Sequence, residues 1–152
     1  MKIAILITAS LFILALPAIS EDDLHLTFLK SWCDLTGYWI PEDVTIDTLG
    51  NILVTDSFNH RIIKFSPNGN TIKIIGSKGT GDCQFNNPCG IALDKEGNIY
   101  VADTFNNRIQ KLSSDGNFIA KWGTKGKGNG QFNYPWDVSI DSSNNIYVAD
   151  TY

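Results

Sequence analysis

The stretch that decides the fold runs Asn98-Ile-Tyr-Val-Ala-Asp-Thr-Phe-Asn-Asn-Arg-Ile-Gln-Lys111. Its first five residues and the segment that begins at Arg108 have the β-branched and aromatic content of strands, and polar residues separate the two. A related stretch begins at Asn51 and another at Asn145, each 47 residues away. No segment has helical periodicity over a useful length. The sequence therefore predicts a repeat of short strands.

The repeat keeps its register from residue 40 to residue 152 without an insertion or deletion. Residues of the same type recur at intervals of 47, namely Pro41, Pro88 and Pro135, Asp47, Asp94 and Asp141, and Asp56, Asp103 and Asp150. In the second copy the predicted strands are residues 90–94, 98–102, 108–112 and 118–122. Four short antiparallel strands per copy are typical of a β-propeller blade, which must stack on other blades to bury its faces.

The segment 98–111 resembles the NHL-repeat family of β-propellers, as do Gln131-Phe132 and the Gly-rich stretch before them. The resemblance covers residues 41–152 and implies four-stranded blades, usually six to a ring. We predict an all-β partial propeller of about two and a half blades. Its parts are NHL repeat 1 at residues 41–87, repeat 2 at residues 88–134 and an incomplete repeat 3 at residues 135–152. We interpret the chain as a fragment of a longer propeller whose missing blades belong to the rest of the protein.

The first twenty residues have the pattern of a secretory signal peptide. Lys2 gives a positive start, residues 3–16 are apolar, and Ala18 and Ser20 are small residues two positions apart. We predict a signal peptide at residues 1–20 with cleavage after Ser20. The apolar run is shorter than the roughly 20 residues that span a bilayer, so no transmembrane anchor is expected after cleavage. The sequence thus predicts a secreted or extracytoplasmic protein.

The N-terminal segment 21–40 contains a further predicted strand. Phe28 and Trp32 have the same spacing as two aromatic residues in the fourth strand of repeat 2. We expect residues 27–32 to form a stray fourth strand that closes the ring by completing the last blade, because closure hides exposed sheet edges.

The charge of the chain argues against nucleic-acid binding. The formal net charge is −4, so a basic surface for nucleic acid is not expected.

The cysteines are candidates for disulfide formation. An exported chain meets oxidising conditions in which cysteines pair, and there are three, Cys33, Cys83 and Cys89. Cys83 and Cys89 flank one loop and are candidates for a local disulfide, with free thiols as the alternative. Their spacing matches no recognised zinc pattern.

Polar residues that recur in every copy are interpreted as scaffold. One aspartate precedes each tight turn, where a carboxylate accepts backbone N–H groups. Another ends the second strand and can pair with an arginine that opens the third. An active site is normally made once, whereas a device that holds the fold is made in each blade. The residues assigned to the scaffold are Asp47, Asp56, Asn59, Arg61, Asp94, Asp103, Asn106, Arg108, Asp141 and Asp150.

Candidate binding residues stand where the copies disagree, around the repeated proline. The differing sets are Ile40, Asn87 and Tyr134 before it, Glu42, Cys89 and Trp136 after it, and Asp43, Gly90 and Asp137 one step further. Strand alternation places them at the entrance to a central channel. Tyr134 and Trp136 beside Asp137 predict a platform for a sugar, peptide or small ligand, with packing between blades as the alternative. His60, in a loop on the same face, is a candidate metal ligand or base, or is simply solvated.

The family resemblance implies two classes of function. NHL propellers often bind proteins, RNA or extracellular ligands, and for this acidic, exported chain we predict a scaffold for a protein or small extracellular ligand. The alternative is a fragment of a metal-dependent six-bladed propeller enzyme, similar to peptidylglycine-amidating lyase or gluconolactonase-like hydrolases. Such enzymes need histidine or carboxylate ligands that converge on the channel. We predict no catalytic residue, cofactor or metal ligand in this part of the chain.

Overall fold

The computed structural model describes residues 3–7, 11–15, 30–32 and 39–151. The chain divides into two compact units, residues 1–39 and residues 40–152. In the first unit three strands form an antiparallel sheet, β1 (Ile3–Ile7), β2 (Leu11–Ala15) and β3 (Lys30–Trp32). No helix among the described residues is long and apolar enough to cross a membrane.

The predicted ring-closing strand at residues 27–32 is described only in part. Residues 30–32 form β3, which pairs with β2, whereas residues 27–29 and Cys33 lie outside the described residues. Part of the segment 1–20, including Ser20, also lies outside them. Signal cleavage and ring closure therefore stay predictions.

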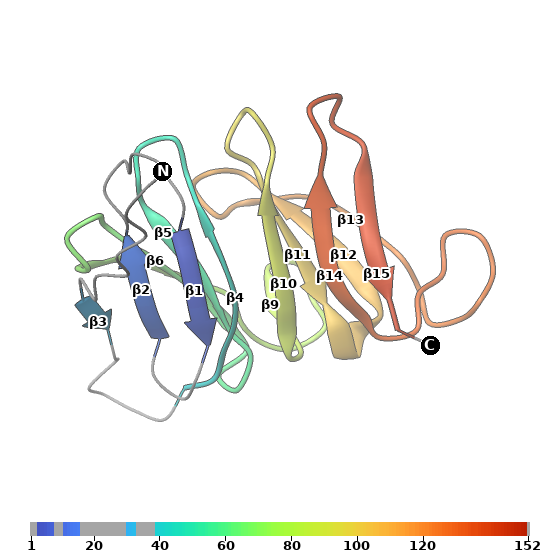
Figure 1. Ribbon diagram of the computed structural model, residues 1–152. Helices are drawn as coiled ribbons and strands as arrows, with labels where there is room; N and C mark the ends of the chain where they lie inside the picture. The colour runs from blue at the N-terminus through green and yellow to red at the C-terminus, as the bar shows by residue number, and fades with distance from the viewer. Residues whose placement is uncertain (1–2, 8–10, 16–29, 33–38, 152) are drawn as a thin grey trace. The chain divides into compact units, whose positions relative to one another are not determined.

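Residues 40–152 are built from three antiparallel sheets in chain order (Figure 1). The first contains β4 (Pro41–Ile46), β5 (Ile52–Asp56), β6 (Arg61–Phe65) and β7 (Thr71–Ile75). The second contains β10 (Pro88–Leu93), β11 (Ile99–Asp103), β12 (Arg108–Leu112) and β13 (Phe118–Trp122). The third contains β14 (Pro135–Ile140) and β15 (Ile146–Asp150). A short parallel pair and one 3-10 helix lie in the loops, β8 (Ser77–Lys78), β9 (Gln84–Phe85) and η1 (Thr104–Asn106).

The predicted strands of repeat 2 agree closely with the structure. The predictions at residues 108–112 and 118–122 coincide with β12 and β13, and β10 and β11 lie within two residues of theirs. The two complete sheets have the same meander order. The structure thus confirms an all-β partial propeller of four-stranded blades.

Apolar side chains fill the space between successive blades. The cluster between the first two contains Leu53, Ile62, Ile75, Phe85, Ile91, Ile99, Val101 and Leu112. The next contains Tyr100, Ala102, Ile109 and Val138. Because successive side chains of a strand point to opposite faces, β11 contributes alternate residues to both clusters, and all five of its residues are buried.

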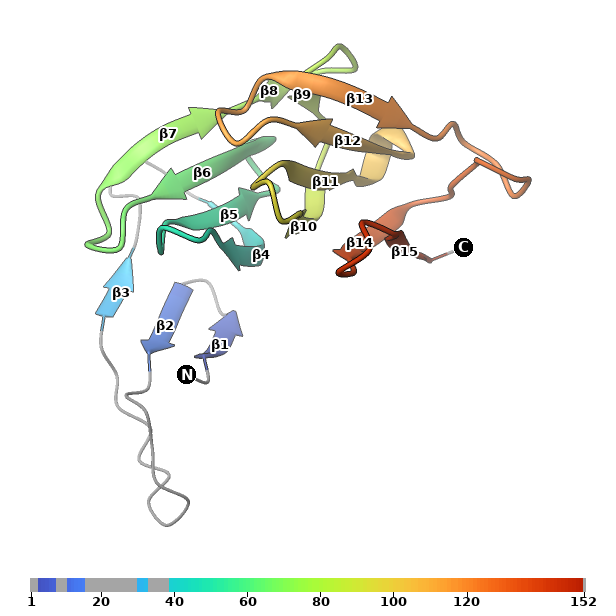
Figure 2. The same ribbon diagram turned by 90° about the horizontal axis from the view of Figure 1, so that it is seen from above.

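The strands β4, β10 and β14 begin their blades on the inner side, and β7 and β13 lie on the outer side (Figure 2). β10 contacts both β4 and β14. The loop after the second strand of a blade meets the connection that enters the blade, as shown by the hydrogen bond from the Phe105 N–H to the Asn86 carbonyl oxygen (3.0 Å). Loops and bulges of successive blades therefore meet at one end of the inner strands.

Candidate functional site

Each inner strand has an irregularity directly after its proline. In β10 the pairing with β11 shifts register between Pro88 and Ile91, and β4 and β14 shift at the corresponding place. A β-bulge leaves residues out of the ladder and re-aims their side chains. The residues after the proline that differ between repeats stand at these bulges.

A hollow of about 190 Å³ lies among the three bulges. It is lined by Glu42, Asp43, Cys89, Gly90, Trp136 and Asp137. The lining contains three carboxylates and no basic side chain, and Trp136 is 48% exposed. The structure therefore brings together three of the predicted binding residues, Cys89, Trp136 and Asp137, in a concave acidic surface with one aromatic wall.

Gly90 allows β10 and β14 to approach closely beside the hollow. A Cβ atom at this position would lie 2.5 Å from Asp137 Oδ1 and 2.6 Å from Asp137 Cα, much closer than atoms can pack. The aspartate found at this position in the other two repeats therefore has no room here. Asp137 Oδ1 instead accepts a hydrogen bond from the N–H of its neighbour Val138 (2.7 Å).

Asp43 bridges the first two blades. Its Oδ2 accepts the N–H of Ile91 (2.8 Å) and its Oδ1 accepts the N–H of Val44 (2.7 Å). Burial raises the pKa of Asp43, the two backbone hydrogen bonds oppose this, and the negative charge of Asp137 raises it further. A positive charge in the hollow would relieve the repulsion between Asp43 and Asp137.

Thr55 is a residue of this site that the sequence analysis missed. Its buried hydroxyl donates to the carbonyl oxygen of Cys89 (2.6 Å) and accepts the N–H of Asp43 (3.0 Å). The signal was available in the repeat, because Ala102 stands 47 residues later at the equivalent position. Thr55 therefore fixes two bulges through a contact that one pair of blades has and the other lacks.

His60 and Tyr134 are not among the residues that line the hollow. His60 Nδ1 accepts the N–H of Asn87 (2.9 Å), and in the next blade Asn107 Oδ1 accepts the N–H of Tyr134 (3.1 Å). We call this repeated contact the interblade latch. The ring of Tyr134 packs edge-on against Phe105, with 5.7 Å between ring centroids. Tyr134 therefore does not join Trp136 in the lining of the hollow, as the predicted aromatic pair required, and Trp136 is the aromatic residue of that lining.

Burial and nearby charges shift the pKa of His60. The pKa of His60 is lowered first by burial and then by the positive charge of Lys78, while Asp103 and Asp56 act in the opposite direction. Because Nδ1 accepts a hydrogen bond, the neutral imidazole is the form that fits.

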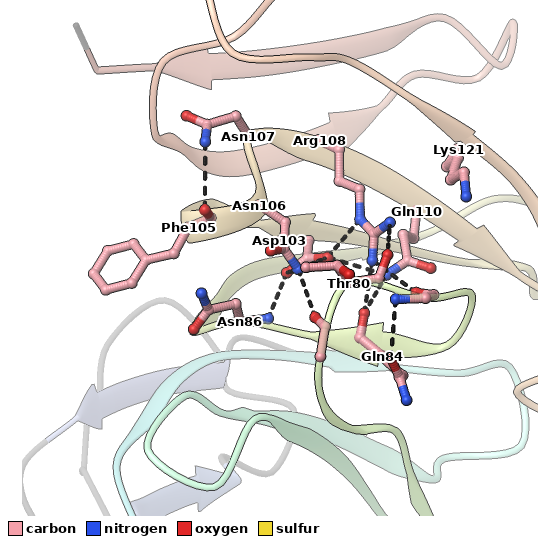
Figure 3. A network of polar contacts seen from close by, with 12 residues as sticks. Thr80, Gln84, Asn86, Asp103, Phe105, Asn106, Asn107, Arg108, Gln110 and Lys121 are labelled. Atoms are coloured by element: carbon pink, nitrogen blue, oxygen red, sulfur yellow. Dashed lines mark hydrogen bonds and ion pairs between the residues drawn. The ribbon is translucent and has the colours of Figure 1, made fainter.

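A buried polar network surrounds Asp103 (Figure 3). Its carboxylate accepts hydrogen bonds from Arg108 Nε (2.7 Å) and Gln110 Nε2 (3.1 Å). The guanidinium nitrogens of Arg108 also donate to three carbonyl oxygens of the preceding connection, those of Thr80, Gly81 and Gln84. In the first blade, Asp56 pairs with Arg61 in the same way (2.8 Å). The expected Asp–Arg pair thus forms in both complete blades and ties strands to loops.

The aspartate before each tight turn accepts hydrogen bonds from backbone N–H groups two and four residues later. For Asp47 these donors are Leu49 (2.9 Å) and Asn51 (2.8 Å). Asp94 and Asp141 make the same contacts. The pKa of Asp141 is lowered to about 2, mainly because its carboxylate accepts hydrogen bonds from the side chain and the backbone N–H of Asn145. These residues thus stabilise turns, in agreement with the scaffold interpretation.

The disulfide expected between Cys83 and Cys89 is not formed, since both are free thiols. Cys83 Sγ lies 3.6 Å from the carbonyl oxygen of Gly116 at the turn before β13. Cys89 is buried in the bulge of β10, and its Sγ lies 3.6 Å from the carbonyl oxygen of Asn87. Cys83 contacts the turn before β13 and Cys89 lies in the bulge of β10, so the two thiols have different surroundings although they are close in sequence.

Comparisons with known proteins agree with this architecture. The family model named NHL repeat matches residues 38–65, 85–112 and 132–152. No curated protein sequence matches the chain significantly.

Three solved structures illustrate the similarity. A protein of unknown function from Bacteroides thetaiotaomicron has a TM-score of 0.74 at 20% identity, over 93% of this chain and 40% of its own. A streptogramin B lyase structure has a TM-score of 0.66 at 19% identity, over 93% and 41%. Virginiamycin B lyase from Staphylococcus aureus has a TM-score of 0.66 at 18% identity, over 93% and 42%. The chain spans about two fifths of the length of these structures, and at such identity the likeness concerns the fold.

Proposed function

The chain belongs to the NHL-repeat family, and from this premise we propose that it is an exported propeller scaffold that binds a positively charged group of a protein or small extracellular ligand. The proposed site is the hollow at the bulges of β4, β10 and β14. The observation that carries the proposal is its lining, which combines Glu42, Asp43 and Asp137 with the exposed indole of Trp136 and contains no basic side chain.

Both the carboxylates and the indole that line the hollow attract a cation. An ammonium or guanidinium group forms charge-assisted hydrogen bonds with carboxylates. The same cation is attracted to the face of an indole ring, by about 0.5–2 kcal/mol. Asp43 and Asp137 repel each other in the free protein, so a bound cation also removes an unfavourable interaction. The hydrogen bonds of Thr55 to Asp43 and Cys89 hold the bulges of β4 and β10 in place before the ligand arrives.

A pair of short peptides with otherwise uncharged residues tests this proposal, one with a single lysine and the other with norleucine at that position. Calorimetric titration should show that the protein prefers the lysine peptide, and Asp137→Asn should weaken its binding by about tenfold, which corresponds to one charge-assisted hydrogen bond. Glu96→Gln is the matched control, because it removes one negative charge at the turn between β10 and β11, at the opposite end of these strands. Equal affinity for the two peptides, or equal effects of the two substitutions, would refute the proposed site.

Export is the second part of the proposal, supported by the signal-like pattern of residues 1–20. N-terminal sequencing of the protein secreted from an expressing cell should begin at Glu21. Retention of residues 1–20 on protein that stays inside the cell would contradict it.

An enzymatic role is the alternative, favoured by the similarity in fold to streptogramin B lyase and virginiamycin B lyase. Among the described residues, no group of three or more His, Cys, Asp or Glu side chains is arranged to hold a metal ion. Under this alternative the metal ligands would come from other parts of the protein. One equivalent of tightly bound metal in the full-length protein, together with lyase or hydrolase activity that is lost on chelation, would favour the enzyme over the scaffold.

A further inference from the structure

The loop between β13 and β14 contains an asparagine–glycine pair, Asn129-Gly130, that is exposed to solvent. Gln131 donates its N–H to the carbonyl oxygen of Gly128 (3.0 Å), so Asn129 and Gly130 occupy the two central positions of a β-turn. Gly130 has a φ of +72°, and no atom lies within 4 Å of the place where its Cβ would be. Both residues are exposed.

The N–H of Gly130 has no hydrogen-bond partner among the residues that the structure describes. This follows from the turn, because the central peptide group of a β-turn lies outside its single hydrogen bond. The side chain of Gln131 strengthens the turn by accepting the N–H of Gly128 at its Oε1 atom (2.9 Å). A free backbone nitrogen therefore directly follows an exposed asparagine side chain, and glycine presents no side chain to shield it.

The chain contains an internal comparison for this arrangement. Asn68 is also exposed and also precedes a glycine, but the N–H of Gly69 donates to the carbonyl oxygen of Ser66 (2.8 Å). Asn68 and Asn129 thus share the same two-residue sequence and differ in whether the backbone nitrogen is engaged.

We propose that Asn129 is a site of spontaneous modification, at which the asparagine converts to aspartate and isoaspartate in the folded protein. The Gly130 backbone nitrogen loses its proton and forms a bond to Asn129 Cγ, and the bond from Cγ to the amide nitrogen breaks to release ammonia. Water then adds to either carbonyl of the resulting cyclic imide and breaks one of its two C–N bonds. The products carry one additional negative charge, and isoaspartate also lengthens the backbone.

The modification has a structural consequence for the loop that enters the third blade. Hydrogen bonds hold the loop on both sides of the turn, from the Gly126 N–H to the Phe132 carbonyl oxygen (3.0 Å) and from the Phe132 N–H to the Thr124 carbonyl oxygen (2.9 Å). An extra backbone atom at residue 129 disturbs this register. Isoaspartate there should therefore increase hydrogen exchange at Gly126 and Phe132.

The test is to incubate the protein at mildly alkaline pH and measure both asparagines by peptide mapping and mass spectrometry, in buffer and in urea. In the folded protein Asn129 should convert several-fold faster than Asn68, and the rate should rise with pH because the attacking nitrogen must lose its proton. In urea the two rates should converge, since both turns are lost. Asn129→Gln should abolish conversion at residue 129, and Asn68→Gln should leave it unchanged. Equal native rates, or a difference that persists in urea, would overturn the proposal.

Discussion

Replacing His60 with asparagine should remove the pH dependence of one interblade latch while preserving the latch itself. His60 Nδ1 accepts the N–H of Asn87 (2.9 Å), and the next latch uses Asn107, whose Oδ1 accepts the N–H of Tyr134 (3.1 Å). A protonated Nδ1 cannot accept a hydrogen bond, whereas an asparagine amide is unaffected by pH. Asparagine also tolerates the left-handed backbone of residue 60, which has a φ of 57°.

The expected magnitude follows from the hydrogen bond. Loss of the hydrogen bond between the Asn87 N–H and His60 Nδ1 should lower the free energy of unfolding by about 1 kcal/mol. The pKa of His60 is lowered below its ordinary value of 6.5 in the folded protein, first by burial, so the unfolded chain binds the proton first as the pH falls. The contribution of His60 to the free energy of unfolding is therefore complete above the ordinary pKa. It falls by about 1 kcal/mol as the pH drops through the folded pKa.

Urea unfolding followed by tryptophan fluorescence, between about pH 8 and about pH 5, measures this effect. His60→Asn should match the original protein at the higher pH and exceed its stability by about 1 kcal/mol at the lower. The carboxylates titrate in both proteins, so the difference between the two curves isolates His60. Asn107→His is the reverse substitution in the next blade. It should make the second latch sensitive to acid and so increase the loss of stability at the lower pH. Parallel curves for the original protein and His60→Asn would refute the reasoning.

Three further predictions concern other parts of the molecule. Arg108→Ala should lower the free energy of unfolding by about 3–5 kcal/mol in the same assay, because it leaves the buried Asp103 carboxylate without its cation; a loss below 1 kcal/mol would contradict this. Gly90→Ala should cost at least about 1–3 kcal/mol, since the added Cβ overlaps Asp137, and unchanged stability would show that the inner strands separate freely. Calorimetry should show that binding of the lysine peptide weakens as the pH falls through the raised pKa of Asp43; binding that is constant across this range would exclude Asp43 from the site.

The repeat made most of the fold predictable. A fixed interval of 47 residues aligned the strands, and the recurring Asp–Arg pairs identified a polar contact within each of the two complete blades. The cysteine pairing could not be obtained in this way, because Cys83 and Cys89 occur in one copy and the repeat gives no second example to compare. Closeness in sequence then suggested a bond that the separate surroundings of the two thiols do not provide.

The sequence predicted the location of the candidate site better than it predicted which residues line it. Disagreement between copies pointed to the bulge positions, where the structure places Cys89, Trp136 and Asp137 around one hollow. The same criterion selected Tyr134, whose backbone belongs to an interblade latch. Whether a variable residue lines a hollow or holds a loop depends on contacts between blades, and a comparison of aligned copies contains no information on those contacts.

The bulge after each repeated proline affects which substitutions such a protein can accept during evolution. Its residues stand outside the strand ladder, so a substitution there does not shift the pairing of the rest of the strand. Each blade can therefore acquire its own pair of side chains without a change in its strand pairing, although the neighbouring bulge limits the choice, as Asp137 does at Gly90. Recognition in this architecture can diversify through neighbouring pairs of bulges, while the sheets that present them stay the same.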